Sequence, residues 1–234
     1  MQVLDRMDEM KAMVARLRDA ERTRLGLGFV ASTLYGYLPE VIRRYRAARP
    51  DVELTLLELT TMEQIAALKE GRIDVGFGRI PFNDASLERT VLRNEKLCAA
   101  LPLTHRLSSC TGLLKLEELA GDALVVYPKA PRPSYADQVL ALFRDRGLKP
   151  MRVHEVRELQ TALGLVAAET GVCIVPASVE RLRRDNVVYR RLDEPEAVSP
   201  IIMSARKGDR SPEIGLILRL VKEMYRKEGI IFGA

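Results

Sequence analysis

The sequence contains few of the residues on which metal sites, disulfide frameworks and membrane anchors depend. Its 234 residues include three cysteines, two histidines and no tryptophan. No two cysteines form a C-x-x-C pair and no zinc-ligand spacing is present, so free thiols in a reducing cytosol are expected. No apolar run approaches the roughly 18 residues of a membrane span, and the first residues lack a signal-peptide core. We therefore predict a cytoplasmic protein without metal, cofactor or membrane contact.

Motifs for catalysis are also missing. Ser32 does not lie in a G-x-S-x-G setting, neither histidine has a recognisable partner, and no carboxylate pair belongs to a motif. The net charge of +5 is mild and spread along the chain, so it does not establish nucleic-acid binding. With 47% hydrophobic and 29% charged residues, the chain is typical of a globular protein of one large or two small domains. These features favour a binding domain over an enzyme.

The first 23 residues predict a charged helix with a narrow apolar stripe. Its apolar residues are spaced by 4, 3, 4 and 3 positions, as in a heptad seam: Val3, Met7, Met10, Val14 and Leu17. The narrow stripe favours packing against a partner helix. An ordinary amphipathic helix packed on its own domain is the alternative.

The next segments alternate between strand and helix patterns. A strand, LGLGFVAS, precedes a helix from about Gly36 to Ala48, and the strand VELTLLEL leads to a second helix and the strand IDVGF. This order predicts a parallel sheet with helices on both faces. Gly26, Gly28 and Ala31 satisfy G-x-G-x-x-A, but they lie inside the apolar run rather than in the turn after it. We therefore reject a nicotinamide site.

The stretch from Thr61 to Arg79 is the most informative in the first half. Thr61 and Gln64 have the spacing of a capping box, and Gly71 is placed to end the helix. A capped helix N-terminus favours anions, and Arg79 could add a positive charge. On this stretch alone we favour the simpler interpretation, in which Thr61 is only a cap and Arg79 a surface residue.

The second half repeats the same pattern of helix, glycine and buried strand. Strands are predicted at LERTVLRNE, LCAALP, ALVVYP, MRVHEV, VCIVP, VVYRRL and PIIMSARK. Ser134 is predicted to cap a helix, with Asp137 as its capping-box partner, and Gly171 to close the following helix. Short helices are expected near Leu116–Leu119 and at ASVERL, and a longer one from Pro212 to Glu228. Two similar α/β lobes follow from this repetition.

Three hydroxyl residues, Ser32, Thr61 and Ser134, stand between predicted strands and helices. In open α/β sheets the carboxyl ends of the strands are where ligands bind. The hydroxyls are therefore expected to meet in a cleft between the lobes, which suits a small carboxylate better than a phosphate.

Several segments together resemble the effector-binding domain of LysR-type transcriptional regulators, in particular those that control degradation of catechol, benzoate and chloroaromatics. They are LGFVAS, PEVIRRYRAARPDVELTLLE, EGRIDVGFGR, TVLRNE, YPKAPRPSYAD and EVRELQTALGLVAAETGVCIVPAS. The resemblance implies a periplasmic-binding-protein-like pair of Rossmann-like lobes joined by two crossovers. It places a linker and dimerisation helix at 1–23, lobe I at 24–94 and 201–234, and lobe II at 95–200.

By similarity to muconate-responsive members, the resemblance implies seven effector-binding residues: Ser32, Thr61, Pro133, Ser134, Tyr135, Leu159 and Ile201. It also implies a second pocket for an aromatic acid around Arg93, Glu95 and Tyr225, although a plain salt bridge is the alternative. Arg93 and Glu95 are two positions apart and so share one strand face. Ser134 and Tyr135 depart from the Asn and Phe of close relatives, which leaves the exact ligand open.

The resemblance implies the sensor of an activator of aromatic-compound catabolism, with cis,cis-muconate, chloromuconate or benzoate as effector. It also implies assembly into a homodimer or tetramer. The family's N-terminal winged helix-turn-helix is not in this sequence, so DNA contact is expected only through that missing domain. A free-standing small-carboxylate binding protein of the same fold and an enzyme with an interlobe cleft are the alternatives.

Overall fold

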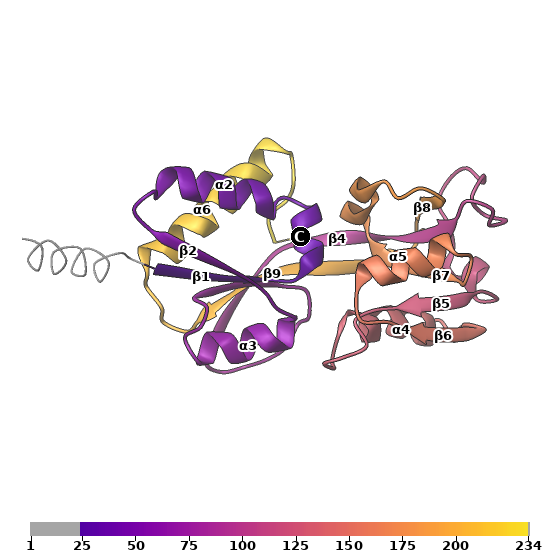
Figure 1. Cartoon of the computed structure of the whole chain (residues 1–234), viewed down its shortest axis with the longest axis horizontal. Helices are drawn as coiled ribbons and strands as arrows, with labels where there is room; N and C mark the ends of the chain where they lie inside the picture. The colour runs from indigo at the N-terminus through magenta and orange to yellow at the C-terminus, as the bar shows by residue number, and fades with distance from the viewer. Residues whose placement is uncertain (1–23, 234) are drawn as a thin grey trace, which may run out of the picture.

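The computed structural model describes residues 24–233. The helix predicted for residues 1–23 lies outside this range, so that helix and the self-association expected from it stay predictions. Figure 1 shows two lobes side by side, joined by long strands that run from one to the other. Within the described range, every helix is too short or too polar to reach across a bilayer.

Lobe I, at the left of Figure 1, is built on three parallel strands, as the sequence predicted, and their order in the sheet is β2-β1-β3. Helices α2 and α6 cover one face of the sheet and α3 covers the other. The elements of lobe I are β1 (Arg24–Phe29), η1 (Ala31–Tyr35), α2 (Leu38–Ala48), β2 (Glu53–Glu58), α3 (Thr61–Lys69), β3 (Val75–Gly78) and α6 (Pro212–Lys227).

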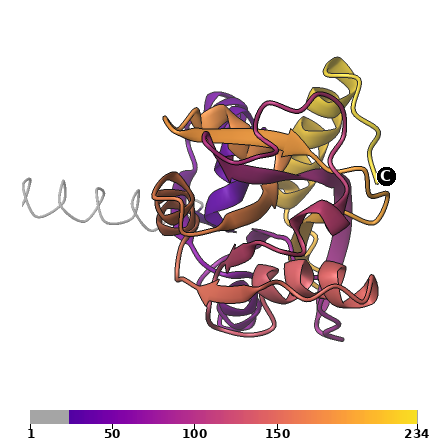
Figure 2. The same cartoon turned by 90° about the vertical axis from the view of Figure 1, so that its right-hand side faces the viewer.

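Lobe II, which faces the viewer in Figure 2, has a mixed sheet. Strand β5 pairs in parallel with both β6 and β7, and β7 continues the sheet towards the joining strands. Its elements are η2 (Leu116–Leu119), β5 (Ala123–Val126), α4 (Tyr135–Asp145), β6 (Arg152–Glu155), α5 (Leu159–Ala167), β7 (Val172–Pro176), η3 (Ala177–Leu182) and β8 (Val187–Arg191).

The two lobes share a pair of antiparallel strands, β4 (Leu87–Pro102) and β9 (Val198–Arg206). The sequence predicted two strands in place of β4, because the charged half LERTVLRNE and the apolar half LCAALP look unlike each other. The structure shows one strand of 16 residues whose first half lies in lobe I and whose second half is buried in lobe II. The change of pattern therefore marks a change of lobe and not the end of a strand.

Each lobe has its own hydrophobic core. In lobe I, one cluster combines residues from β1, α2, β3, β9 and α6, and a smaller one combines Ala67 and Leu68 of α3 with Ile73 and Leu87. The cluster of lobe II is formed by residues between Leu97 and Ala197. The apolar contacts divide largely in this way, and the lobes are connected through β4, β9, polar groups and the side chains of Tyr35 and Ile80, which pack against the core of lobe II. This division allows the lobes to move relative to each other as rigid units.

Two helix ends differ from the sequence prediction. The N-cap of α3 is Thr60, whose hydroxyl accepts from the Glu63 N–H, and Glu63 completes the capping box. Thr61 and Gln64 therefore do not form the predicted box. Helix α5 ends at Ala167, and Glu169 has the positive φ of 59° expected at Gly171. Ser134 does cap α4 with Asp137, and Gly71 has φ +71°, as predicted.

The glycines of the apparent dinucleotide fingerprint lie within β1. A Cβ at Gly26 would lie 2.8 Å from the carbonyl oxygen of Arg72 and from the Cα of Ile73. Gly26 therefore permits close approach of the segment between α3 and β3, and that packing accounts for the glycine without a nucleotide.

Candidate ligand-binding site

A cleft of about 780 Å³ lies between the lobes, where the N-terminal ends of α3, α4 and α5 meet η1. Its lining includes six of the seven residues that the resemblance implies: Ser32, Thr61, Pro133, Ser134, Tyr135 and Leu159. The seventh, Ile201, is not among the lining residues. The sheet edge predicted from the order of elements is thus the edge where these side chains gather.

Arg79 is the central charged group of the cleft, and its prediction as a surface residue was wrong. Its side chain is 3% exposed and lies just past β3. Its Nε donates to Ser32 Oγ at 2.8 Å, and its backbone N–H donates to Thr61 Oγ1 at 3.2 Å. Both hydroxyl oxygens therefore act as acceptors towards Arg79. Each keeps one proton that a ligand in the cleft can accept.

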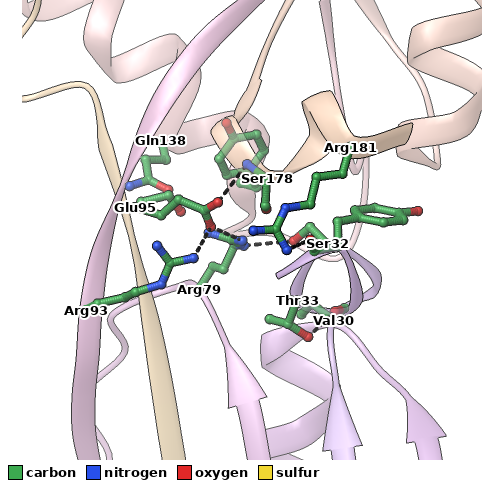
Figure 3. Close-up of polar contacts among 12 residues, drawn as sticks. Val30, Ser32, Thr33, Arg79, Arg93, Glu95, Gln138, Ser178 and Arg181 are labelled. Atoms are coloured by element: carbon green, nitrogen blue, oxygen red, sulfur yellow. Dashed lines mark hydrogen bonds and ion pairs between the residues drawn. The ribbon is translucent and has the colours of Figure 1, made fainter. Parts of the chain in front are cut away.

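Glu95 balances the charge of Arg79 beneath the cleft (Figure 3). Arg79 Nη2 donates to Glu95 Oε2 at 2.6 Å, the Ser178 N–H donates to Oε1 at 2.8 Å, and Arg93 lies 3.5 Å from Oε2. Burial raises the pKa of Glu95, but the charges of Arg79 and Arg93 outweigh it, with help from the Ser178 N–H. The net pKa is below its ordinary value. The carboxylate is therefore ionised and carries one negative charge between two guanidinium groups.

In the part of the chain that the structure describes, the cleft has an unpaired hydrogen-bond donor and an excess positive charge, both of which favour an anion. Arg79 Nη1 is buried and has no hydrogen-bond partner among the residues that the structure describes. Two arginines face one buried carboxylate, so the network as a whole has an excess positive charge. A buried donor without a partner costs free energy, which a carboxylate reaching it would recover. In the range 24–233, no group of three metal-ligating side chains was found.

The hydroxyls on the lobe II side of the cleft are already used within the protein. Ser134 Oγ donates to the Pro128 carbonyl at 2.9 Å and accepts from the Ala136 N–H at 3.2 Å. Tyr135 Oη donates to the Ile174 carbonyl at 3.3 Å. Lobe II therefore offers a ligand the helix dipole at the N-terminus of α4 rather than these two side-chain hydroxyls.

Tyr225 and Ile201 line a second, smaller cavity inside lobe I. Its volume is about 20 Å³, and its other lining residues come mainly from α2, β3, β4 and α6. The Arg93 guanidinium lies beside it, 5.9 Å from the Tyr225 ring centroid and 5.6 Å from that of Tyr37. The structure therefore brings Arg93, Glu95 and Tyr225 together as expected. A cavity of this size holds about one water molecule, so an aromatic acid would require the side chains to move.

Arg79 was predicted to be a surface residue, although its position in the chain indicates a place in the cleft. Arg79 immediately follows a short, fully buried strand, and the carboxyl end of such a strand opens onto the ligand edge of the sheet. Arg157, just before α5, also lines the cleft and was not singled out. It makes no ion pair with any residue in the described range.

Comparisons with known proteins identify the family to which this chain belongs. Residues 18–226 match the family described as the LysR substrate binding domain. A probable cat1 operon transcriptional activator of Acinetobacter lwoffii is 46% identical over 96% of this chain and 74% of its own length. The transcriptional regulator CatR of Pseudomonas putida is 48% identical over 89% of this chain and 71% of its own.

A solved structure gives the same fold. The BenM effector-binding domain with its effector benzoate superposes with a TM-score of 0.84 at 39% identity, covering 89% of this chain and 95% of that one. These relatives are transcriptional regulators, so the prediction of a binding domain rather than an enzyme is confirmed. The two-lobed fold inferred from the sequence is confirmed as well. The chain belongs to the family of LysR substrate-binding domains.

Proposed function

We propose that this chain is the effector-sensing domain of a LysR-type activator of aromatic-compound catabolism. The names of its relatives, which include a cat operon activator and a benzoate-binding BenM domain, support this assignment. The observation that carries it is the buried Arg79, whose contacts leave the Ser32 and Thr61 hydroxyl protons free on the cleft wall. A carboxylate is the ligand that this set of donors fits.

The proposed ligand is a dicarboxylate of the muconate type or an aromatic acid. One carboxylate accepts from Ser32 and Thr61, close to the charge of Arg79. The other lies at the N-terminus of α4, and Leu159 packs against the carbon chain. Because the two ends of the ligand contact different lobes, binding favours the arrangement in which the lobes are close, and this population shift is the signal.

Four further assignments belong to the same proposal. Lobe I comprises 24–94 and 201–234, and lobe II comprises 95–200. The protein acts in the cytoplasm, assembles into a homodimer or tetramer, and contacts DNA through the winged helix-turn-helix of the full-length regulator. The hydrophobic clusters of the two lobes support the lobe boundaries, because they divide at about residues 92–97 and 197–201.

The first prediction is that cis,cis-muconate raises the melting temperature of the 234-residue chain. A ligand at 100 times its Kd stabilises the native state by about 2.7 kcal/mol. For a chain of this length that is a rise of roughly 5–10 °C. Thermal-shift measurements should cover cis,cis-muconate, chloromuconates, benzoate and catechol. Dimethyl muconate, which has the same carbon chain without the charges, is the control and should give no shift. If no acid in the panel raises the melting temperature, the proposed function is wrong.

The second prediction concerns the small cavity in lobe I. We propose that an aromatic acid enters beside Tyr225 and competes with Glu95 for Arg93. Arg93→Met removes the cation while keeping much of the side-chain volume, so benzoate affinity should fall about tenfold or more, as the loss of a charge-assisted hydrogen bond implies. Calorimetric titration of benzoate into both proteins measures this. Equal affinities would mean that Arg93 and Glu95 form only a structural salt bridge.

A further inference from the structure

Two side chains from different lobes meet across the cleft. Gln160, in the first turn of α5, donates from Nε2 to the hydroxyl oxygen of Tyr35 at 3.0 Å. Tyr35 is the last residue of η1, the segment that also carries Ser32. Both Tyr35 and Gln160 line the interlobe cleft. A hydrogen bond between them therefore spans the space that the ligand must enter and leave.

Lobe II holds η1 at a second point. Arg181, from η3, donates to the Tyr35 carbonyl at 3.4 Å, and its guanidinium lies 5.2 Å from the centroid of the Tyr37 ring. Figure 3 shows the Arg181 side chain extending from lobe II towards the segment that contains Ser32. Both the backbone and the side chain of Tyr35 are thus bonded across the lobes. The position of η1 therefore depends on how close the lobes are.

Like the hydroxyls of Ser32 and Thr61, the Tyr35 hydroxyl has a proton that no described residue accepts. A phenolic hydroxyl has one proton to donate and an oxygen that accepts. Gln160 uses the oxygen, and no described residue accepts the proton. Tyr35 is only partly buried and lines the cleft, so its proton is within reach of a ligand there.

We propose that Tyr35 is a further effector-binding residue and that Gln160 positions it. In this arrangement Gln160 holds the Tyr35 hydroxyl across the lobes, and Tyr35 donates its remaining proton to a carboxylate of the effector. Closure of the lobes and recognition of the ligand then depend on the same hydroxyl. This inference rests on the proposed function, because it assigns a contact to the same ligand.

The test compares Tyr35→Phe with Gln160→Ala by stopped-flow and calorimetric binding of cis,cis-muconate to the 234-residue chain. Gln160→Ala loses the interlobe bond but keeps the Tyr35 hydroxyl, so the dissociation rate should rise and the affinity should fall about 3- to 10-fold. Tyr35→Phe also loses the donor to the carboxylate, so the affinity should fall about 10- to 100-fold. The double variant should bind like Tyr35→Phe alone, since Gln160 then has no hydroxyl to hold.

Tyr189→Phe is the matched control, because Tyr189 lies in β8, does not line the cleft and has no partner for its hydroxyl among the described residues. It should bind cis,cis-muconate as the wild type does. Wild-type affinity in Tyr35→Phe would overturn the inference, and equal losses in Tyr35→Phe and Gln160→Ala would overturn the donor role of Tyr35. If the wild-type chain itself binds no member of the acid panel, the proposed function is wrong. This outcome can be told apart from the two above, because they are differences between variants and a wild type that binds.

Discussion

Arg79→Met is expected to lower the free energy of unfolding by roughly 3–5 kcal/mol, the usual effect of removing one partner of a buried ion pair. For a chain of this length the melting temperature should fall by about 6–20 °C. The reason is that both side chains of the Arg79–Glu95 pair are 3% exposed, so Glu95 would keep a buried charge with only Arg93 and the Ser178 N–H beside it. Binding of cis,cis-muconate should be lost at the same time. Chemical unfolding and calorimetry measure the two effects.

The pH dependence and a matched variant distinguish this effect from general damage. The pKa of Glu95 is lowered in the folded protein, so its stabilising contribution is present above the unfolded pKa and is lost as the pH falls through the folded pKa. The difference in free energy of unfolding between the wild type and Arg79→Met should therefore become smaller at acidic pH. Arg44→Met breaks a pair with Glu40 in which the side chains are 28% and 33% exposed, and it should cost no more than about 1 kcal/mol. If Arg79→Met is as stable as Arg44→Met, the buried pair does not have the role assigned to it.

Thr61→Ala is expected to weaken binding of cis,cis-muconate by about tenfold or more while the fold is kept. Thr61 Oγ1 accepts from the Arg79 backbone N–H, so its proton is the one available to the ligand, and a hydrogen bond to a charged group is worth roughly 1.5–3 kcal/mol. Ser32→Ala should have a similar effect on affinity. Ser32→Ala should also lower the free energy of unfolding, because Arg79 Nε would lose its hydrogen-bond partner in a buried site. Calorimetric titration gives both affinities.

Thr60→Ala is the control for Thr61→Ala, since the two threonines are neighbours at the same helix end. The Thr60 hydroxyl is committed to Glu63, both as donor and as acceptor. Its loss should therefore cost about 1 kcal/mol of stability, as for other N-caps, and leave the affinity unchanged. Unchanged affinity in both Ser32→Ala and Thr61→Ala would show that the ligand or the site has been misidentified.

The secondary structure was largely predictable because its signals are local. The apolar runs at IDVGF and VCIVP predicted β3 and β7, which are buried along their whole length. The pattern of Ser134 and Asp137 predicted the N-terminus of α4. Errors arose where two local patterns competed. Thr60 and Thr61 can both cap a helix by composition, and only the backbone angles of the folded chain select Thr60.

The location of the cleft was predictable from the sequence, but the hydrogen-bonding state of its hydroxyls was not. The carboxyl ends of the strands placed Ser32, Thr61 and Ser134 at one edge, and all three line the cleft. Whether a hydroxyl still has a proton to donate to a ligand depends on its hydrogen-bond partners, which lie elsewhere in the chain. The Ser134 hydroxyl donates its proton to the Pro128 carbonyl, whereas the Ser32 oxygen accepts a hydrogen bond from Arg79, 47 positions away. Sequence spacing contains no information about such contacts.

The sequence by itself therefore determined most of the elements, the two-lobed class and the sheet edge at which the cleft lies. These follow from periodicity, caps and glycines, which are set by interactions between residues near in the chain. Only the tertiary structure decided that β4 continues from one lobe into the other, that Arg79 is buried against Glu95, and that Ile201 lies in the small cavity rather than in the cleft. The reason is that these depend on strand order and lobe packing, which bring together residues far apart in sequence and set the cost of burying their charges.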